Sequence, residues 1–260
     1  MSDPIWTRAK VGPAPPRGVS FVFIGLLVAF AAVTLLLGLE RGGTIGVFVF
    51  AFLGWIISLC LHEWGHAATA WIGGDRSVAE MGYLTLNPLR YAHPFMSLVV
   101  PLAFLAMGGI GFPGGAVYIN THALRGPVWR AAVSAAGPAM NLLFLVFLAL
   151  AIHISGANGT LLAGLAFLAF LQATALILNL LPLPGLDGFG IVQSLFPESE
   201  RAAMAQIASW LSLVVFVVII SAPELLRPVW QVAEILCNGV GVDSNDIANG
   251  IALFRFWDSN

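Results

Sequence analysis

Long runs of apolar residues constrain this chain more than any other feature of its sequence. A membrane-spanning helix needs about 20 consecutive, mostly apolar residues. The apolar runs, of which the last is shorter than that, cover Val19–Leu39, Thr44–Trp71, Val128–Ile154, Thr160–Leu181, Ala202–Ala222 and Pro228–Gly239. Only 9% of the 260 residues are charged, whereas a soluble domain typically carries about 25%. So few charges cannot coat a water-soluble core, and we therefore expect a membrane protein.

The basic residues predict which side of the membrane each span end faces. Arg8, Lys10 and Arg17 precede the first run and place the N-terminus on the cytoplasmic side. No small-residue cleavage site stands out after this run, so we expect an uncleaved span. The apolar segment Pro94–Phe112 would break the charge bias if it crossed fully, and we expect it to be re-entrant. The C-terminal ends of the second and fourth runs then lie on the same, cytoplasmic side.

These features predict an all-α polytopic membrane protein with about five to six transmembrane helices and a re-entrant segment. Whether Pro228–Gly239 crosses the membrane is left open. Ser77–Asn87 and Ala116–Asn120 mix β-branched and polar residues, which predicts short β-strands; ordinary connecting loops are the alternative. We expect one membrane-embedded domain over residues 1–260, with its core at 44–195 and no soluble accessory domain.

Net charge and cysteine content exclude several classes of protein. The formal net charge of −2 is too small to suggest a nucleic-acid partner. The two cysteines, Cys60 and Cys237, are too few for a disulfide scaffold or a cysteine-rich metal site. Function must therefore be sought in the few other polar residues of the apolar regions.

The stretch His62-Glu63-Trp64-Gly65-His66 has the pattern H-E-x-x-H at the end of the second apolar run. Residues four apart lie on one face of a helix, so both imidazoles can point at one metal ion. Glu63 can reach a water molecule on that ion and act as general base. Ionisable residues at membrane depth are costly and are functional candidates by default. The alternative is that both histidines mark the interface end of a span and face water.

A catalytic zinc site needs three protein ligands and an open position, so a third ligand must come from elsewhere. The best candidate is Asp187, in the segment Asn179–Gly188 (NLLPLPGLDG) at the end of the fourth run. Two prolines end the helix there, and flanking glycines free the backbone around one acid. An exposed Asp in a helix-terminating loop is the alternative. The remaining histidines, His93, His122 and His153, are poorer candidates because they flank the re-entrant segment or lie at the far end of a span.

Taken together, HEWGH and NLLPLPGLDG resemble the site-2 protease family of intramembrane zinc metalloproteases. NPLRYAHPFMSLVVPL (Asn87–Leu102) and AAGPAMNLL (Ala135–Leu143) agree with segments of the same family. The resemblance extends from about Ala51 to Leu195. Phe189 stands where the family often has a second glycine, and no PDZ domain is present, so the chain resembles the compact branch.

The resemblance implies that His62, His66 and Asp187 ligate one catalytic Zn²⁺ and that Glu63 is the base. It also implies that Asn141 assists at the substrate carbonyl. The alternative for Asn141 is a bond to backbone loosened at Gly137-Pro138.

The expected function is hydrolysis of peptide bonds in or near transmembrane segments of substrate proteins within the lipid bilayer. The expected location is a prokaryotic plasma membrane, with the active site near its cytoplasmic side. A metal-ion transporter or sensor, and an inactive family member that acts as a scaffold, are the alternatives. The sequence leaves open the substrate and its cleavage site, any prior cleavage by another protease, the regulator and the oligomeric state.

Overall fold

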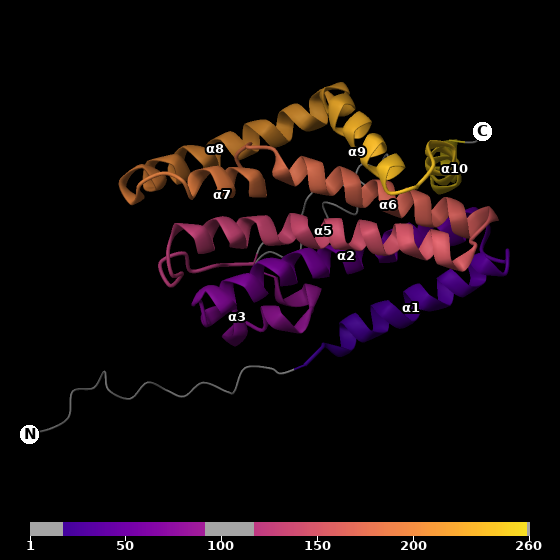
Figure 1. The fold of residues 1–260 in the computed structure, drawn as a ribbon, viewed down its shortest axis with the longest axis horizontal. Coiled ribbons are helices and arrows are strands. Elements are labelled where there is room, and N and C mark those ends of the chain that lie inside the picture. The colour runs from indigo at the N-terminus through magenta and orange to yellow at the C-terminus, as the bar shows by residue number, and fades with distance from the viewer. Residues whose placement is uncertain (1–17, 92–116, 259–260) are drawn as a thin grey trace, which may run out of the picture.

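The computed structural model describes residues 18–91 and 117–258, and the described part is built of helices and connecting turns (Figure 1). The helices of four or more residues are α1 (Phe21–Gly38), α2 (Gly43–Gly73), α3 (Ser77–Glu80), α5 (Pro127–Ser155), α6 (Gly159–Leu180), α7 (Asp187–Gln193), α8 (Glu198–Ser221), η5 (Pro223–Leu226), α9 (Arg227–Gly239) and α10 (Ser244–Phe254). Among the described residues, α1, α2, α5 and α6 are long and apolar enough to cross a membrane. Each of these four matches a predicted span to within two residues, which confirms the helical fold class and four helices capable of spanning a membrane.

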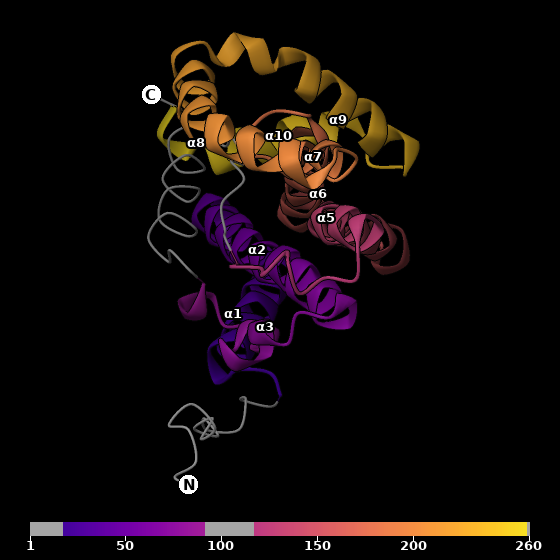
Figure 2. The ribbon, with the colours of Figure 1, turned by 90° about the vertical axis from the view of Figure 1, so that its left-hand side faces the viewer.

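Helices α2, α5 and α6 run side by side and form the centre of the bundle (Figures 1 and 2). Of the most apolar stretch of α6, 78% is buried, against 11% for α1. Helix α6 contacts α2 and α5 and also α9 and α10. Enclosure on several sides explains why its sequence is apolar all round, whereas α1 packs at the periphery.

Close approach of α2 and α5 depends on Gly65, within the histidine motif. A Cβ atom at Gly65 would lie 2.7 Å from the Met140 side chain and 2.8 Å from the carbonyl oxygen of Ala136. Small residues let helix backbones approach in this way within a membrane. The HEWGH segment is thereby pressed against α5 at the level of Ala136.

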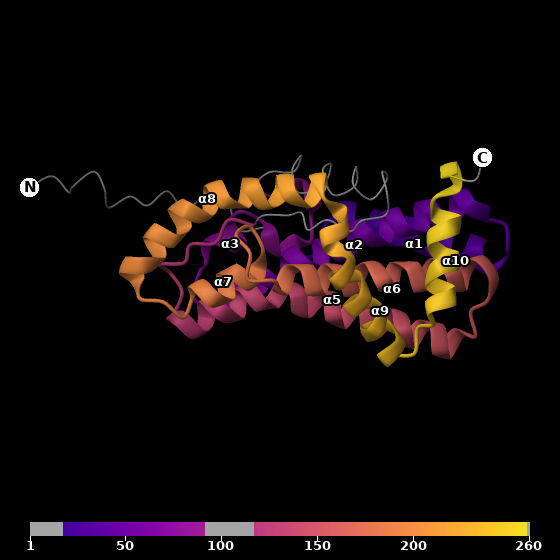
Figure 3. The same ribbon diagram turned by 90° about the horizontal axis from the view of Figure 1, so that it is seen from above.

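The C-terminal ends of α2 and α6 and the N-terminal end of α5 lie at the same end of the bundle (Figures 1 and 3). The amide of Arg125, just before α5, donates to the carbonyl of Gly73 at the end of α2, at 3.0 Å. The stretch between α2 and α5 therefore begins and ends on one side. The predicted re-entrant segment Pro94–Phe112 lies outside the described residues, so its path stays a prediction.

The strand prediction for Ser77–Asn87 is wrong. This stretch forms α3 and the 3₁₀ turn Tyr83–Thr85. Buried Asp75 accepts hydrogen bonds from the backbone amide and the hydroxyl of Ser77, which starts a helical turn. Leu86, with φ of 57°, then interrupts any extended path. A polar, β-branched composition cannot outweigh these local bonds.

The second predicted strand, Ala116–Asn120, begins outside the described residues. Its described part, Val117–Asn120, forms neither helix nor strand. The amide of Asn120 donates to Asp75 Oδ2 at 2.8 Å. That bond ties the segment to the end of α2.

The C-terminal helices α9 and α10 pack against α6, and α8 connects them with α7 along the chain (Figure 1). Helix α8 includes most of the predicted span Ala202–Ala222, and its crossing of the membrane stays a prediction. Helix α9 has 13 residues and is about 20 Å long, which is short of the roughly 30 Å of a hydrocarbon core. It matches the predicted helical stretch Pro228–Gly239 but is too short to span alone. Helix α10, which the sequence did not predict, packs against α6.

Candidate metal centre and active site

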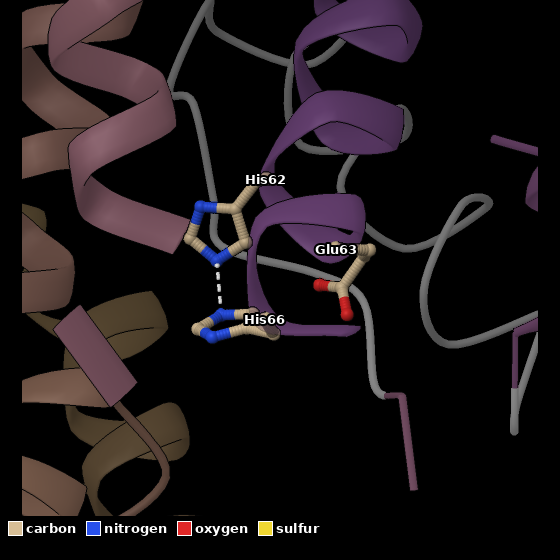
Figure 4. Close-up of side chains that lie close together, drawn as sticks. All are labelled: His62, Glu63 and His66. Carbon is tan, nitrogen blue, oxygen red and sulfur yellow. Dashed lines mark hydrogen bonds between the residues drawn. The ribbon is translucent and has the colours of Figure 1, made fainter. Parts of the chain in front are cut away.

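His62 and His66 lie one turn apart on α2, and their imidazole rings face each other (Figure 4). Their Nε2 atoms are 3.0 Å apart. Each residue is only 7% exposed. Spacing of four residues puts both rings on the face of α2 that packs against α5. The alternative of two histidines that merely face water at a span end does not fit this burial.

Asp187, which follows the C-terminal end of α6 in sequence, lies beside the two histidines. It is the first residue of α7, and its carboxylate oxygens lie 3.2 Å from His62 Nε2 and 3.3 Å from His66 Nε2. The chain can turn back here because Gly188 lacks a Cβ, which would lie 2.3 Å from the carbonyl oxygen of Leu180. Two Nε2 atoms and one carboxylate, from two separate parts of the chain, therefore converge on one point.

The spacing of these three donors fits a tetrahedral zinc ion. Zinc bonds of 2.0–2.1 Å place neighbouring ligand atoms about 3.3 Å apart, close to the distances between His62, His66 and Asp187. One carboxylate oxygen of Asp187, Oδ2, is buried and accepts no hydrogen bond. An ionised carboxylate is the form of this side chain that ligates a metal ion.

Gly137, on α5, leaves the space that the metal-facing nitrogens occupy. A Cβ atom there would lie 2.3 Å from His66 Nε2 and 2.5 Å from His62 Nε2. The site therefore requires glycine at position 137. The next residue, Pro138, has no amide N–H and cannot make the hydrogen bond to the carbonyl of Ser134 that a regular helix would have. The Gly-Pro pair of the AAGPAMNLL motif thus faces the two histidines.

Each histidine has a different partner on its other ring nitrogen. His66 Nδ1 lies 2.7 Å from the carbonyl oxygen of Val133, which can only accept, so this nitrogen carries the proton. His62 Nδ1 lies 2.7 Å from Oδ1 of Asn141. This amide oxygen can only accept a hydrogen bond, so His62 Nδ1 also carries the proton. Both Nε2 lone pairs then face each other and the Asp187 carboxylate. Such a cluster of acceptors is repulsive unless a cation lies between them, so its chemistry fits a metal ion.

Asn141 is 3% exposed and binds other side chains through both ends of its amide. Besides accepting from His62, it donates to Ser58 Oγ at 3.1 Å and to Gln172 Oε1 at 3.0 Å. These partners are side chains and not the loosened backbone near Pro138. The expected role of Asn141 at a substrate carbonyl stays a prediction.

Glu63 is 2% exposed and lies beside the two imidazoles (Figure 4). Its ligand-type atom and those of His62 and His66 all lie within 4.8 Å of one another. Oε2 of Glu63 accepts a hydrogen bond from the backbone amide of Val117 at 3.1 Å. That bond holds the carboxylate next to the cluster, within reach of which a general base must lie.

Comparison with known proteins finds relatives that are named as candidate zinc metalloproteases. The chain is 47% identical over 218 residues to Rip2 of Mycolicibacterium smegmatis, named as a candidate zinc metalloprotease, with 83% of each chain covered. It is 44% identical over 259 residues to Rip2 of Mycobacterium tuberculosis, which bears the same name, with 96% of each covered. The candidate zinc metalloprotease YwhC of Bacillus subtilis is 32% identical over 180 residues, which cover 65% of this chain and 78% of YwhC. No protein-family model and no solved structure matches.

This chain belongs to the site-2 protease family of zinc metalloproteases. Two of the other candidate histidines lie away from the family's metal-binding motifs. His122 is exposed and faces Glu198 at 3.6 Å. His153 lies in the last turn of α5, against Gly241. His93 lies outside the described residues.

Sequence reasoning missed four contributors to this site-2 protease centre: Ser58, Val133, Gly137 and Gln172. Ser58 and Gln172 are polar residues inside apolar runs, a signal that was available. The carbonyl of Val133 carries no sequence signal, because every residue has one. Gly137 stood in a motif that the family resemblance singled out, but its contact with both imidazoles follows only from the packing of α5 on α2.

Proposed function

We propose that the chain is an intramembrane protease that hydrolyses peptide bonds in or near transmembrane segments of other membrane proteins. Membership of the zinc metalloprotease family supports the reaction, and four membrane-capable helices support the setting. The observation that carries the proposal is the convergence of His62, His66 and Asp187 beside Glu63. In this family the setting selects the substrate, because a site on a membrane helix meets membrane-embedded segments first.

His62, His66 and Asp187 are the residues that would hold one zinc ion. When bound, zinc supplies Lewis-acid activation of a water molecule for attack on a carbonyl group. The chain's own contribution would be three ligands, one fewer than the four of a closed structural zinc site. Two of the proposed ligands are on α2 and the third is on α7. Their relative positions therefore depend on how α5 and α6 pack against these helices.

Glu63 is the proposed general base. It accepts a proton from the attacking water molecule, while the water oxygen bonds to the peptide carbonyl carbon. It then returns the proton to the amide nitrogen as the carbon–nitrogen bond breaks, which releases a carboxylic acid and an amine. The Val117 amide holds the carboxylate in place at 3.1 Å during both transfers.

We place the active site near the cytoplasmic side of a prokaryotic plasma membrane. The supporting observations are the basic residues ahead of α1 and the location of the histidine motif toward the C-terminal end of α2. Hydrolysis needs water, and a site near a span end is closer to water than one at the midplane. Expected partners are transmembrane protein substrates and the surrounding lipid.

The decisive experiment replaces the proposed base. Glu63→Gln removes the proton acceptor and preserves shape, so cleavage should fall at least about 100-fold while one zinc ion per chain is retained. The measurement is cleavage of doubly tagged single-span membrane proteins in liposomes, with zinc quantified by mass spectrometry. Glu80→Gln is the matched control, because it makes the same change on an exposed turn after α2.

Two outcomes contradict this proposal. Zinc-dependent cleavage that persists in Glu63→Gln excludes Glu63 as the base. If liposomes that contain the wild-type chain take up zinc but no substrate is cleaved, the transporter interpretation is supported.

A further inference from the structure

A buried chain of amide and hydroxyl groups lies behind His62, on the side away from Asp187. Its members are Ser58 on α2, Asn141 on α5 and Gln172 on α6, with exposures of 3%, 3% and 0%. Polar side chains inside a membrane protein are costly unless they bond one another. Three membrane-spanning helices each contribute one such group to the same point. We therefore expect this polar cluster to have a function in addition to packing.

The hydrogen bonds of this cluster run in one direction. His62 Nδ1 donates to Asn141 Oδ1 at 2.7 Å, and Asn141 Nδ2 donates to Gln172 Oε1 at 3.0 Å. Ser58 Oγ accepts from Asn141 Nδ2 at 3.1 Å and itself donates to the same oxygen of Gln172. The carbonyl oxygen of Gln172 is therefore the terminal acceptor for two donors.

That direction decides which nitrogen of His62 is free. If the Asn141 amide were reversed, its NH₂ group would donate to Nδ1, and the proton of neutral His62 would move to Nε2. A protonated Nε2 has no lone pair and cannot bind a metal. In its observed orientation Gln172 opposes this reversal, because its carbonyl oxygen and that of Asn141 would then face each other. Reversal of Asn141 therefore requires the Gln172 amide, whose Nε2 has no hydrogen-bond partner among the described residues, to rotate as well.

Asn141 also faces too little space for a substrate. The cavity bordered by Ser58, His62 and Asn141 has a volume of about 20 Å³. A single water molecule needs at least about 10–15 Å³ on this measure, so the cavity admits about one water and no peptide group. The amide of Asn141 would have to leave both of its acceptors to reach a substrate carbonyl.

We propose that Asn141, Gln172 and Ser58 are positioning residues that fix His62 in its metal-binding tautomer, with Gln172 as the terminal acceptor. This proposal rests on the proposed zinc site and assigns Gln172 and Ser58 a part in it. It replaces a direct role of Asn141 at the substrate with a role through His62. Partners of metal-bound histidines commonly change metal affinity about 10- to 100-fold when removed.

The test measures zinc affinity of the purified full-length chain in detergent, by competition with a chromophoric chelator. Gln172→Leu removes the terminal acceptor and should weaken zinc binding about 10-fold or more. Gln172→Glu keeps acceptor oxygens at that position and should restore near-wild-type affinity. Thr174→Val is the matched control on α6, because the Thr174 hydroxyl is buried and has no hydrogen-bond partner in the described part of the chain. The absorption spectrum of bound Co²⁺ should change in Gln172→Leu and not in Thr174→Val.

A second pair of variants separates the two roles of Asn141. Asn141→Asp is the conservative variant: it still accepts from His62 and can accept from a rotated Gln172 amide, so it should rescue the zinc affinity and the cleavage that Asn141→Leu loses. Asn141→Leu loses the acceptor, and zinc affinity should fall as in Gln172→Leu. If Asn141→Asp abolishes cleavage at full zinc occupancy, Asn141 is a donor to the substrate and the proposal is overturned.

Unchanged zinc affinity in Gln172→Leu overturns the proposal as well. If Gln172→Leu fails to fold, the Asn141 pair decides the question alone. These affinity measurements do not depend on cleavage, so they stand apart from the Glu63→Gln experiment.

Discussion

His62 and His66 are two copies of the same side chain, one helical turn apart, yet they are held by different kinds of partner. His66 donates to the backbone carbonyl of Val133, whereas His62 donates to the Asn141 side chain. A backbone acceptor cannot be removed by substitution of its own side chain. A side-chain acceptor can, and it is only as well fixed as the groups behind it. The comparison teaches that His66 is oriented by the backbone, whereas His62 is oriented by three specific polar side chains.

Gly137→Ala acts on both histidines at once and should have the largest effect. The new methyl group would lie within 2.5 Å of both Nε2 atoms, so both rings must move. We expect zinc content to fall from one ion per chain to nearly none and cleavage to be lost. Gly25→Ala, on an exposed face of α1 with nothing within 4 Å, is the control and should retain zinc. Full zinc occupancy in Gly137→Ala would show that the site can form elsewhere than between α2 and α5.

Removal of zinc tests whether His62 and His66 bind the same metal ion. A ligand at 100 times its dissociation constant stabilises the folded state by about 2.7 kcal/mol if it binds only that state. Chelation should therefore lower the thermal midpoint of the wild-type chain, followed by tryptophan fluorescence. His62→Ala and His66→Ala should show no such shift. A chelator effect of equal size in these variants would place the stabilising metal at another site.

Val133→Ala sharpens the contrast and should have the smallest effect. It removes two buried methyl groups but keeps the carbonyl that orients His66, so zinc affinity should stay within about twofold. The cost should appear in the free energy of unfolding, at about 1–2 kcal/mol. Zinc titration beside thermal unfolding measures both quantities. A loss of affinity as large as that of Gln172→Leu would erase the distinction between the two histidines.

The predictable parts of the site are those that depend on the spacing of residues along a helix or on which side of the membrane a span ends. His62 and His66 follow from a four-residue interval on a helix, which any helix presents on one face. Asp187 followed from the charge bias, which put the ends of two spans on the same side. The structure brings these residues together, although their roles as ligands remain a proposal.

The parts that were not predictable depend on packing or on local backbone bonds. Gln172 and Ser58 stood out as polar residues in apolar runs, but only the crossing of α2, α5 and α6 shows that they meet. The predicted strand at Ser77–Asn87 failed because Asp75 supplies the first bonds of a helical turn. Helix α7, which begins at Asp187, was missed because two prolines and two glycines around it favoured an extended chain.

The two ends of the proposed metal site are separated along the chain by the whole of α5 and α6. Ribosomes make the chain from its N-terminus, so the histidines of α2 are synthesised and inserted well before Asp187 emerges. An unfinished chain therefore has two of the three proposed ligands and lacks the acid that completes the proposed set. We expect a protease built in this order to be inactive during its own insertion into the membrane and to become active only after its central helices are in place.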